Sequence, residues 1–293
     1  MANSADDISK NFCIMPWIGV ATDVTGGIHP CCWMELNKDD VYTDDFSEYQ
    51  TSEYLKKYKT QFLNGEWPDA CNRCKINEER GNGSKRLREN FQYNKKVGDW
   101  DDLPDKFSII DVRLSNVCNL GCISCSPKSS SFIKQEVEKH GLEVFPRKTQ
   151  VHYREYATKN LINPYTNKNI NDLTDMIGHD SRIYITGGEP SLVKKAKDLL
   201  LTLRDKGYNE TVHLEFNSNF QALNQSWIDI LKDFKGEMWP SLDGIGHVAE
   251  YVRYPSDWNR VSENLKSFKD QCKNWRIRIM PTVSILSIFG LRD

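Results

Sequence analysis

The stretch Cys118-Asn119-Leu120-Gly121-Cys122-Ile123-Ser124-Cys125 places three cysteines within eight residues, directly after an apolar run over 107–115 that is typical of a buried strand. Four residues span up to ~14 Å when extended, so the loop must curl to bring the thiols together, and Gly121 permits such a curl. A curled loop of this kind can give three thiolates to a four-iron cluster and leave one iron open. An open position on a metal is typical of a catalytic site, whereas structural sites are closed. The alternative is a loop of free or zinc-binding cysteines, although zinc sites usually contain paired CxxC units.

The sequence after this loop alternates between predicted strands and helices. Further strands are expected at 182–186, 211–217, 236–243 and 276–286, and helices at 191–206, 226–234 and 257–272. Repeated units of this kind predict an α/β fold, in which crossover helices connect parallel strands. Active-site residues are then expected at the carboxyl ends of the strands. The segment 140–170 fits no such unit and is interpreted as an insertion beside the site, a candidate substrate lid.

Polar motifs stand at those strand ends. Gly-Gly-Glu-Pro (187–190) follows the second strand, Asn-Ser-Asn (217–219) the third, and Ser-Leu-Asp-Gly (241–244) the fourth. Together with the CxxxCxxC motif, they resemble the radical S-adenosylmethionine (SAM) superfamily over residues 107–293. The resemblance implies a partial (β/α)6-type parallel barrel, here ending after the fifth strand, where members of the family usually have a sixth.

The resemblance also implies cofactors and their ligands. Cys118, Cys122 and Cys125 would hold a SAM-binding [4Fe-4S] cluster, and the methionine end of SAM would chelate the open iron. Glu189 would accept a hydrogen bond from the SAM amino group, and Arg253 would pair with the SAM carboxylate. The full set of residues expected to contact SAM is Gly187, Gly188, Glu189, Ser218, Asn219, Ser241 and Arg253.

Several of these assignments have a simpler alternative. Glu189 could serve only the N-terminus of the following helix, where a carboxylate is favoured by the helix dipole. Arg253 could be a solvated surface residue. Asp243 is interpreted as a turn residue and is left out of the site. Turn formation and helix capping are also open for the remaining polar residues, Ser218, Asn219 and Ser241.

A second set of cysteines precedes this region, on a predicted hairpin over 12–31, a helix over 47–62 and a CxxC motif. The spacing resembles the auxiliary iron–sulfur modules called twitch and SPASM domains, although these usually follow the radical SAM region. The resemblance implies a second [4Fe-4S] cluster whose ligands are Cys13, Cys31, Cys71 and Cys74. Cys32 is an alternative ligand. The same spacing allows a structural zinc site. The predicted organisation is therefore an auxiliary module at 1–96, a linker at 97–106 and a radical SAM core at 107–293.

Composition limits the class of protein. The chain has 293 residues and a formal net charge of −2, which argues against nucleic acid held by charge alone. No secretory signal begins the chain, and no apolar stretch approaches the ~20 residues of a membrane span, so a cytoplasmic protein is predicted. Nine cysteines in a cytoplasmic chain favour metal ligation over disulfides.

The resemblance implies an enzyme that cleaves SAM reductively to methionine and a 5′-deoxyadenosyl radical, which abstracts hydrogen from a substrate. The implied partners are SAM, an electron donor such as flavodoxin or ferredoxin, and a substrate of the peptide or cofactor-precursor class. The alternative is a non-catalytic iron–sulfur protein derived from this fold, either an electron carrier or a partner subunit. The expected absence of a sixth strand favours that alternative, whereas the polar motifs at the strand ends favour the enzyme.

Overall fold

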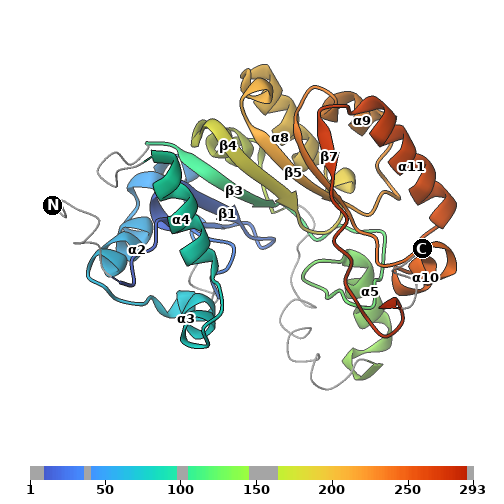
Figure 1. The fold of residues 1–293 in the computed structure, drawn as a ribbon, viewed down its shortest axis with the longest axis horizontal. Coiled ribbons are helices and arrows are strands. Elements are labelled where there is room, and N and C mark those ends of the chain that lie inside the picture. Colours follow the sequence, from blue (N-terminus) through green and yellow to red (C-terminus); the bar gives the residue numbers. More distant parts are fainter. Residues whose placement is uncertain (1–9, 36–40, 98–104, 145–163, 289–293) are drawn as a thin grey trace. The chain divides into compact units, whose positions relative to one another are not determined.

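The computed structural model describes residues 10–35, 41–97, 105–144 and 164–288 (Figure 1). The chain divides into two compact units. The N-terminal unit comprises Met1–Asp23, Gly27–Asp111 and Asp172–Ser181, and the C-terminal unit comprises Val24–Gly26, Val112–Asn171 and Arg182–Asp293. Most of the predicted linker (97–106) and most of the predicted insertion (140–170) lie outside the described residues.

The described strands follow the order β2-β1-β3-β4-β5-β6-β7 in one sheet. They are β1 (Gly19–Thr22), β2 (Ile28–His29), β3 (Phe107–Arg113), β4 (Ile177–Thr186), β5 (His213–Ser218), β6 (Gly236–Pro240) and β7 (Trp275–Ile277). β1 and β2 are antiparallel, whereas β1 pairs in parallel with β3, and β5 pairs in parallel with both β4 and β6. β6 and β7 are also parallel. The predicted α/β class with a mostly parallel sheet is therefore confirmed.

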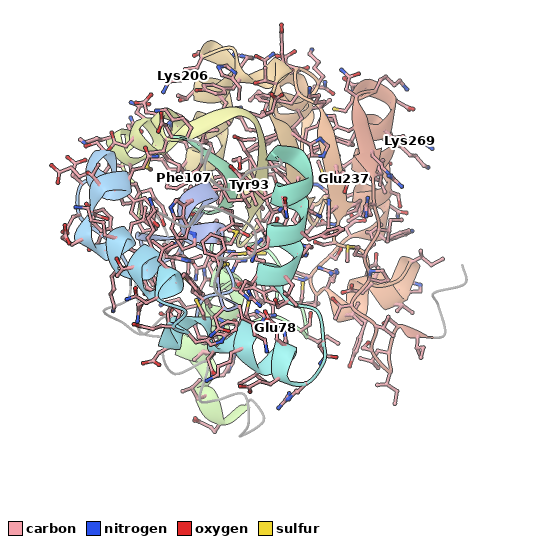
Figure 2. All side chains as sticks on the ribbon, turned by 60° about the vertical axis from the view of Figure 1, so that its left-hand side comes forward. Glu78, Tyr93, Phe107, Lys206, Glu237 and Lys269 are labelled. Carbon is pink, nitrogen blue, oxygen red and sulfur yellow. The ribbon has the colours of Figure 1, made fainter. Side chains whose placement is uncertain are left out.

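The N-terminal unit contains both strands of the predicted hairpin, and β1 also lies beside β3 with Gly19 opposite Ile109. α2 buries Leu55, Tyr58 and Phe62, which stand at helical spacing, as expected for an amphipathic helix. Figure 2 labels three residues of this unit, which are Glu78 on α3, Tyr93 on α4 and Phe107 at the start of β3. The helices of the unit are α1 (Met15–Ile18), η1 (Phe46–Thr51), α2 (Glu53–Leu63), η2 (Asp69–Cys71), α3 (Asn72–Glu79) and α4 (Lys85–Val97), where η marks a 3₁₀ helix.

In the C-terminal unit, helices α8, α9 and α11 cover one face of the parallel strands (Figure 1). The ring of Phe216 on β5 lies 5.7 Å from that of Trp227 on α9, and Phe268 on α11 lies 5.7 Å from Trp275 on β7. The helices of this unit are α5 (Ser131–His140), η3 (Leu142–Val144), η4 (Pro190–Leu192), α8 (Lys194–Asp205), η5 (Tyr208–Glu210), α9 (Gln225–Leu231), α10 (Gly246–Val252) and α11 (Trp258–Gln271). α7 (Asn167–Asp175) is divided between the two residue ranges. None of the helices in the described ranges is long and apolar enough to cross a membrane.

Several local predictions were wrong in part. The expected helix over 191–206 is divided at Val193 into η4 and α8, and the expected strand over 236–243 ends at Pro240. The expected helix over 47–62 is interrupted at Ser52, whose backbone is extended and whose hydroxyl accepts the Leu55 N–H as the N-cap of α2. The expected strand over 276–286 ends at Ile277, and residues 278–284 have no regular structure. Pro281 lacks an N–H for the ladder of a sheet, so the run could not have continued as a regular strand through that residue.

Candidate functional site

The cysteine loop lies between β3 and α5, and the start of α5 holds it from one side. Ser130 Oγ donates to the Leu120 carbonyl (2.7 Å), and Ser131 Oγ accepts from the Cys118 N–H (3.0 Å). Ser130 also caps α5 through the Ile133 N–H, so one hydroxyl serves both the helix and the loop. These bonds fix the backbone around the first cysteine.

The segment that follows α10 holds the other side of the loop. Gly121 N–H donates to the Tyr254 carbonyl (2.6 Å), and Ile123 N–H donates to the Val252 carbonyl (3.0 Å). A Cβ built at Gly121 would lie 2.7 Å from Cδ1 of Phe132. A side chain at this position would displace the ring of Phe132, so close packing against α5 favours glycine here, whereas the sequence suggested that its conformational freedom was needed.

The three loop thiols and all the residues predicted to contact SAM line one cavity of about 170 Å³ within the C-terminal unit. This cavity, called the loop cavity below, lies where β3, β4, β5 and β6 end. Four of its polar lining residues were not predicted, namely Ser124, Ser129, Thr186 and Asn217. Its complete lining is Cys118, Leu120, Cys122, Ser124, Cys125, Ser129, Thr186, Gly187, Gly188, Glu189, Asn217, Ser218, Asn219, Ser241 and Arg253.

Gly187 and Gly188 let the end of β4 approach the chain that leads into the cysteine loop. Gly187 has φ +127°, a backbone conformation that favours glycine. A Cβ on Gly188 would lie 2.2 Å from the Val117 carbonyl oxygen, and one on Gly187 would lie 2.9 Å from the Ser115 carbonyl oxygen. The Gly188 N–H donates to that same Ser115 carbonyl (3.1 Å). The two glycines therefore position the cysteine loop as well as lining the cavity.

Glu189 is almost completely buried, with 1% of its surface exposed. Its Oε1 accepts hydrogen bonds from Ser191 Oγ (2.5 Å), Ser191 N–H (3.2 Å) and Ser218 Oγ (2.9 Å), and its Oε2 accepts from the Asn219 N–H (2.7 Å). Burial raises the pKa of this carboxyl group, while the four hydrogen bonds oppose the shift. Glu189 thus joins the start of η4 to the end of β5, and both the capping role and the site role remain compatible with its position.

Two asparagines, Asn217 on β5 and Asn219 in the turn after it, line the loop cavity. Asn219 Nδ2 donates to Asn119 Oδ1 (2.9 Å) and lies 4.0 Å from Cys118 Sγ. Asn217 Oδ1 is buried and has no hydrogen-bond partner among the described residues. Phe220 follows with φ +59°, which is strained for a bulky residue. Strain of this kind recurs at ligand-binding turns.

Arg253 stands beside the loop cavity and is not a solvated surface residue. Its guanidinium forms an ion pair with Asp243 (Nη2 to Oδ2, 2.7 Å), and Nη1 donates to Cys122 Sγ (3.7 Å). Asp243, which the sequence analysis left out of the site, is 4% exposed and accepts the Thr282 N–H on Oδ1 (2.7 Å). Its position at the end of β6, two residues after Ser241, was the signal in the sequence that could have identified it.

The loop thiols are protonated at neutral pH when no metal is bound. Burial raises the pKa of Cys118 to about 12 and that of Cys125 to about 11. Burial also raises the pKa of Cys122, although the neighbouring Arg253 opposes this shift. Thiolate ligation of a metal at this loop therefore releases protons.

The other predicted thiols, Cys13, Cys31, Cys71 and Cys74, line a second cavity within the N-terminal unit. This four-thiol cavity measures about 20 Å³, and its walls include Trp33, Trp67 and Phe62. In the described ranges, no three His, Cys, Asp or Glu side chains are grouped so as to hold one metal ion. Burial raises the pKa of Cys71 to about 12 and also raises that of Cys13.

The CxxC motif begins α3, with Cys71 as the N-cap and Cys74 in the first turn. A helix N-terminus favours thiolates, because its N–H groups carry partial positive charge. Between the two cysteines, Arg73 places its guanidinium 4.3 Å from the ring centroid of Trp33, which follows Cys31 by two residues. This cation–π contact ties the turn that carries Cys31 to the CxxC motif.

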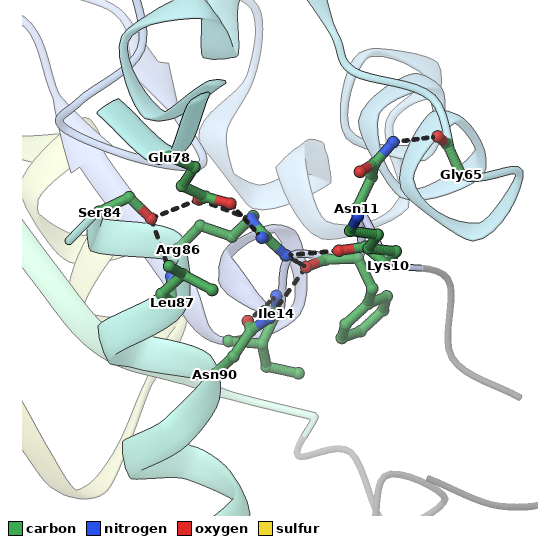
Figure 3. A network of polar contacts seen from close by, with 10 residues as sticks. Lys10, Asn11, Ile14, Gly65, Glu78, Ser84, Arg86, Leu87 and Asn90 are labelled. Atoms are coloured by element: carbon green, nitrogen blue, oxygen red, sulfur yellow. Dashed lines mark hydrogen bonds and ion pairs between the residues drawn. The ribbon is translucent and has the colours of Figure 1, made fainter. Parts of the chain in front are cut away.

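A buried polar network holds the segment that carries Cys13 (Figure 3). Arg86 on α4 forms an ion pair with both carboxylate oxygens of Glu78 on α3 and donates to the Phe12 carbonyl (2.7 Å). Asn90 donates to the same carbonyl (2.9 Å) and accepts the Ile14 N–H (2.9 Å). The backbone on both sides of Cys13 is therefore fixed by α4, and α4 is in turn fixed to α3.

Two cysteines lie outside both cavities. Cys32 does not line the four-thiol cavity, and burial together with a hydrogen bond involving Cys31 raises its pKa. Cys272 is 2% exposed at the end of α11, and its Sγ lies 4.0 Å from the Ile228 carbonyl oxygen. This position agrees with the interpretation of Cys272 as a core thiol.

No protein-family model matches this sequence, and no curated protein matches it either. Among solved structures, the chain is similar to anSMEcpe with bound AdoMet and Cp18Cys peptide, with 18% identity, coverage of 56% of this chain and 40% of that one, and a TM-score of 0.35. It is also similar to Streptococcus suis SuiB bound to precursor peptide SuiA, with 15% identity, coverage of 98% and 59%, and a TM-score of 0.41. The chain thus spans about half the length of these proteins. The likeness is partial in each case.

Proposed function

We propose that this chain is a radical SAM enzyme, in which Cys118, Cys122 and Cys125 hold a [4Fe-4S] cluster that binds SAM. The observation that supports this most strongly is the loop cavity, where three thiols of one loop meet the polar ends of neighbouring parallel strands. Among the described residues that line it, there is no fourth cysteine and no histidine. A donor set of three thiols suits a cluster that keeps one iron open for a ligand.

The residues of the loop cavity fit a ligand that carries both an amino group and a carboxylate, as an amino acid does. When bound, the cluster and SAM supply the reductive cleavage that yields methionine and a 5′-deoxyadenosyl radical. Glu189 Oε2 accepts only the Asn219 N–H among the described contacts, so it retains room for the SAM amino group. The buried Oδ1 of Asn217 and Nε of Arg253 have no partner within the described residues, and a bound ligand would supply one to each.

The other residues that were predicted to contact SAM would have different roles. Ser218 already donates to Glu189 and accepts the Phe220 N–H (3.0 Å), so it acts by holding the carboxylate in place. Ser241 is left to bond the ribose or the SAM carboxylate. The backbones of Gly187 and Gly188 would form the wall against which the ligand lies.

We further propose that the four-thiol cavity holds an auxiliary [4Fe-4S] cluster, with a structural zinc ion as the alternative. Its four lining thiols, without a lining histidine or carboxylate, support a metal that prefers sulfur. Metal analysis of the intact protein separates the two, since a cluster adds iron and sulfide and the alternative adds zinc.

For the substrate, we propose a peptide or a cofactor precursor that lies against the face of the strands opposite α8, α9 and α11. Tyr184, Glu215 and Glu237 are register partners on this face and are partly exposed. The ring of Trp239 lies 6.1 Å from that of Tyr184. Glu215 lies 3.8 Å from Arg182 and Glu237 lies 2.7 Å from Arg278, so this face carries paired charges beside aromatic rings, which suits a polar substrate. The electron donor in this proposal is a flavodoxin or ferredoxin, in the cytoplasm.

The second candidate is a non-catalytic iron–sulfur carrier or partner subunit. The observation that favours it is the short β7, which ends after three residues and leaves the sheet with no described strand beyond it. The observation against it is the loop cavity, because an electron carrier does not need unpaired polar atoms beside its cluster.

The test is 5′-deoxyadenosine formation from SAM by anaerobically reconstituted and chemically reduced protein, measured by chromatography. We expect product from the wild type and none from Cys122→Ala. Cys272→Ala is the matched control, since it removes a buried thiol that lines neither cavity, and it should retain activity. Bound iron without product in the wild type would favour the carrier.

A further inference from the structure

Arg253 lies between a carboxylate and a thiol of the cysteine loop. Its two terminal nitrogens are both used, one by Asp243 (2.7 Å) and one by Cys122 Sγ (3.7 Å). The side chains of Arg253 and Asp243 are 15% and 6% exposed. A buried charge is costly to separate from its partner, so this ion pair fixes the direction in which the guanidinium points.

Asp243 is itself held on its second oxygen. Oδ1 accepts the Thr282 N–H (2.7 Å), while Oδ2 faces Arg253. The residue stands at the turn after β6 and receives this bond from the segment that follows β7. The carboxylate cannot rotate without losing either the backbone bond or the ion pair.

We propose that Asp243 is a positioning residue that aims Arg253 at Cys122, and that Arg253 stabilises the reduced state of the cluster at this ligand. The inference rests on the proposed [4Fe-4S] cluster. Hydrogen bonds to cluster sulfurs and nearby charge are among the factors that set reduction potentials. One-electron reduction makes the cluster more negative, so an N–H donor carrying positive charge favours the reduced form and raises the potential.

This role differs from pairing with the SAM carboxylate, which the sequence suggested for Arg253. Both terminal nitrogens are engaged before any ligand binds, and only the buried Nε has no partner among the described residues. A residue that acted only on SAM would change SAM affinity and leave the potential of the SAM-free cluster unchanged. The potential of the SAM-free protein is therefore the decisive measurement.

The first test is an EPR-monitored redox titration of the reconstituted full chain without SAM. Arg253→Met keeps the bulk of the side chain and removes its charge and donors, so the potential should become more negative. A hydrogen bond to a charged group is worth roughly tenfold in an equilibrium, which corresponds to about 59 mV for one electron. In Arg253→Lys the potential should fall less, because lysine keeps the positive charge but lacks the planar guanidinium group. An unchanged or raised potential in Arg253→Met would overturn the inference.

The second test separates positioning from simple charge. Removing the negative charge of Asp243 would by itself raise the reduction potential of the cluster. Losing the contact of Arg253 with Cys122 would lower that potential. Asp243→Asn should therefore lower the potential in the wild-type background and raise it in the Arg253→Met background. A rise in both backgrounds would overturn the positioning role. The double variant leaves no buried charge unpaired, so it also guards against misfolding of the single variants. Asp233→Asn, which breaks the exposed Arg204–Asp233 pair (3.3 Å), is the matched control.

A third measurement keeps the inference separate from the proposed function. A wild type that carries a full cluster and forms no 5′-deoxyadenosine would refute the enzyme, while the potentials of the variants would still decide the role of Arg253. If no cluster assembles at the cysteine loop, both the proposed function and this inference are refuted.

Discussion

Glu189 places a buried carboxyl group in the wall of the loop cavity, and ionising this group reduces the stability of the folded protein. Its carboxylate is 1% exposed and joins η4 to the end of β5 through four hydrogen bonds. Burial raises its pKa above the ordinary value of 4.5. The folded state therefore binds this proton more tightly than the unfolded state. The contribution of Glu189 to stability is complete below pH 4.5 and is lost as the pH rises through the folded pKa.

We expect Glu189→Gln to remove this pH dependence. At pH 4 the variant should be less stable by about 1–3 kcal/mol, because an amide cannot accept all four hydrogen bonds. The difference from the wild type should shrink between pH 4 and pH 7, since only the wild type must ionise a buried group. Urea unfolding of the metal-free chain at four pH values measures this. Glu210→Gln, at an exposed carboxylate, is the control. A difference that stays constant across this range would contradict the assigned pKa shift.

Gly188 tests whether the end of β4 positions the cysteine loop. In Gly188→Ala, the new Cβ would meet the Val117 carbonyl oxygen at 2.2 Å, and a backbone atom cannot swing aside as a side chain does. We expect a loss of about 1–3 kcal/mol of stability, together with weaker iron binding at Cys118. Thermal unfolding and iron content measure the two effects. Gly83→Ala, where nothing lies within 4 Å of the new atom, should be neutral. Full iron retention in Gly188→Ala would show that the loop adapts.

At the scale of elements, helices α3 and α4 form the frame of the four-thiol cavity. α3 carries Cys71, Cys74 and Glu78, and α4 reaches back through Arg86 to the segment beside Cys13. The guanidinium also lies 5.1 Å from the ring centroid of Trp67, which encloses it on another side. The thiols are thus held by helix contacts that do not depend on a metal.

We expect Arg86→Met to destabilise the N-terminal unit by about 1–3 kcal/mol, because Glu78, which is 16% exposed, would lose its charged partner and keep only the hydrogen bond from Ser84. The double variant Arg86→Met/Glu78→Gln should recover part of this loss and still release its metal faster to a chelator, since the Phe12 carbonyl beside Cys13 would keep only its hydrogen bond from Asn90. Thermal unfolding and chelator challenge measure these effects. The exposed pair Lys56–Glu53 on α2 is the control, where Lys56→Met should cost at most about 1 kcal/mol. Unchanged metal release in the double variant would remove the positioning role of α4.

The sequence predicted those elements whose signals are local. The loop thiols and the polar motifs could be assigned to one site because parallel strands bring their carboxyl ends to one edge, whatever the details of packing. The pairing of β1 with β3 could not be foreseen, because Gly19 and Ile109 are far apart in the chain. Asp243 was missed for a similar reason. Its turn chemistry is visible in the sequence, whereas its ion pair depends on tertiary contacts.

At the scale of the whole molecule, the two thiol sets belong to different compact units. Cys118, Cys122 and Cys125 lie in the C-terminal unit, and the four thiols of the four-thiol cavity lie in the N-terminal unit. Each cavity is lined only by residues of its own unit. The hydrogen bonds that hold the cysteine loop and those that hold Cys13 likewise stay within one unit. Metal binding at one set should therefore survive the loss of the other.

We expect Cys71→Ala and Cys122→Ala to remove different metal sites from the full chain. Cys122→Ala should lose the iron that responds to SAM in EPR spectra and keep the metal of the four-thiol cavity. Cys71→Ala should lose that metal and keep the SAM-responsive iron, because no lining residue of the loop cavity has changed. Iron, zinc and sulfide analysis with EPR before and after SAM measures both, and Cys272→Ala should resemble the wild type. If Cys71→Ala removes only zinc, the zinc alternative holds for the N-terminal unit. If either single substitution strips both sites, the two units are coupled through metal binding and the assignment of separate sites is wrong.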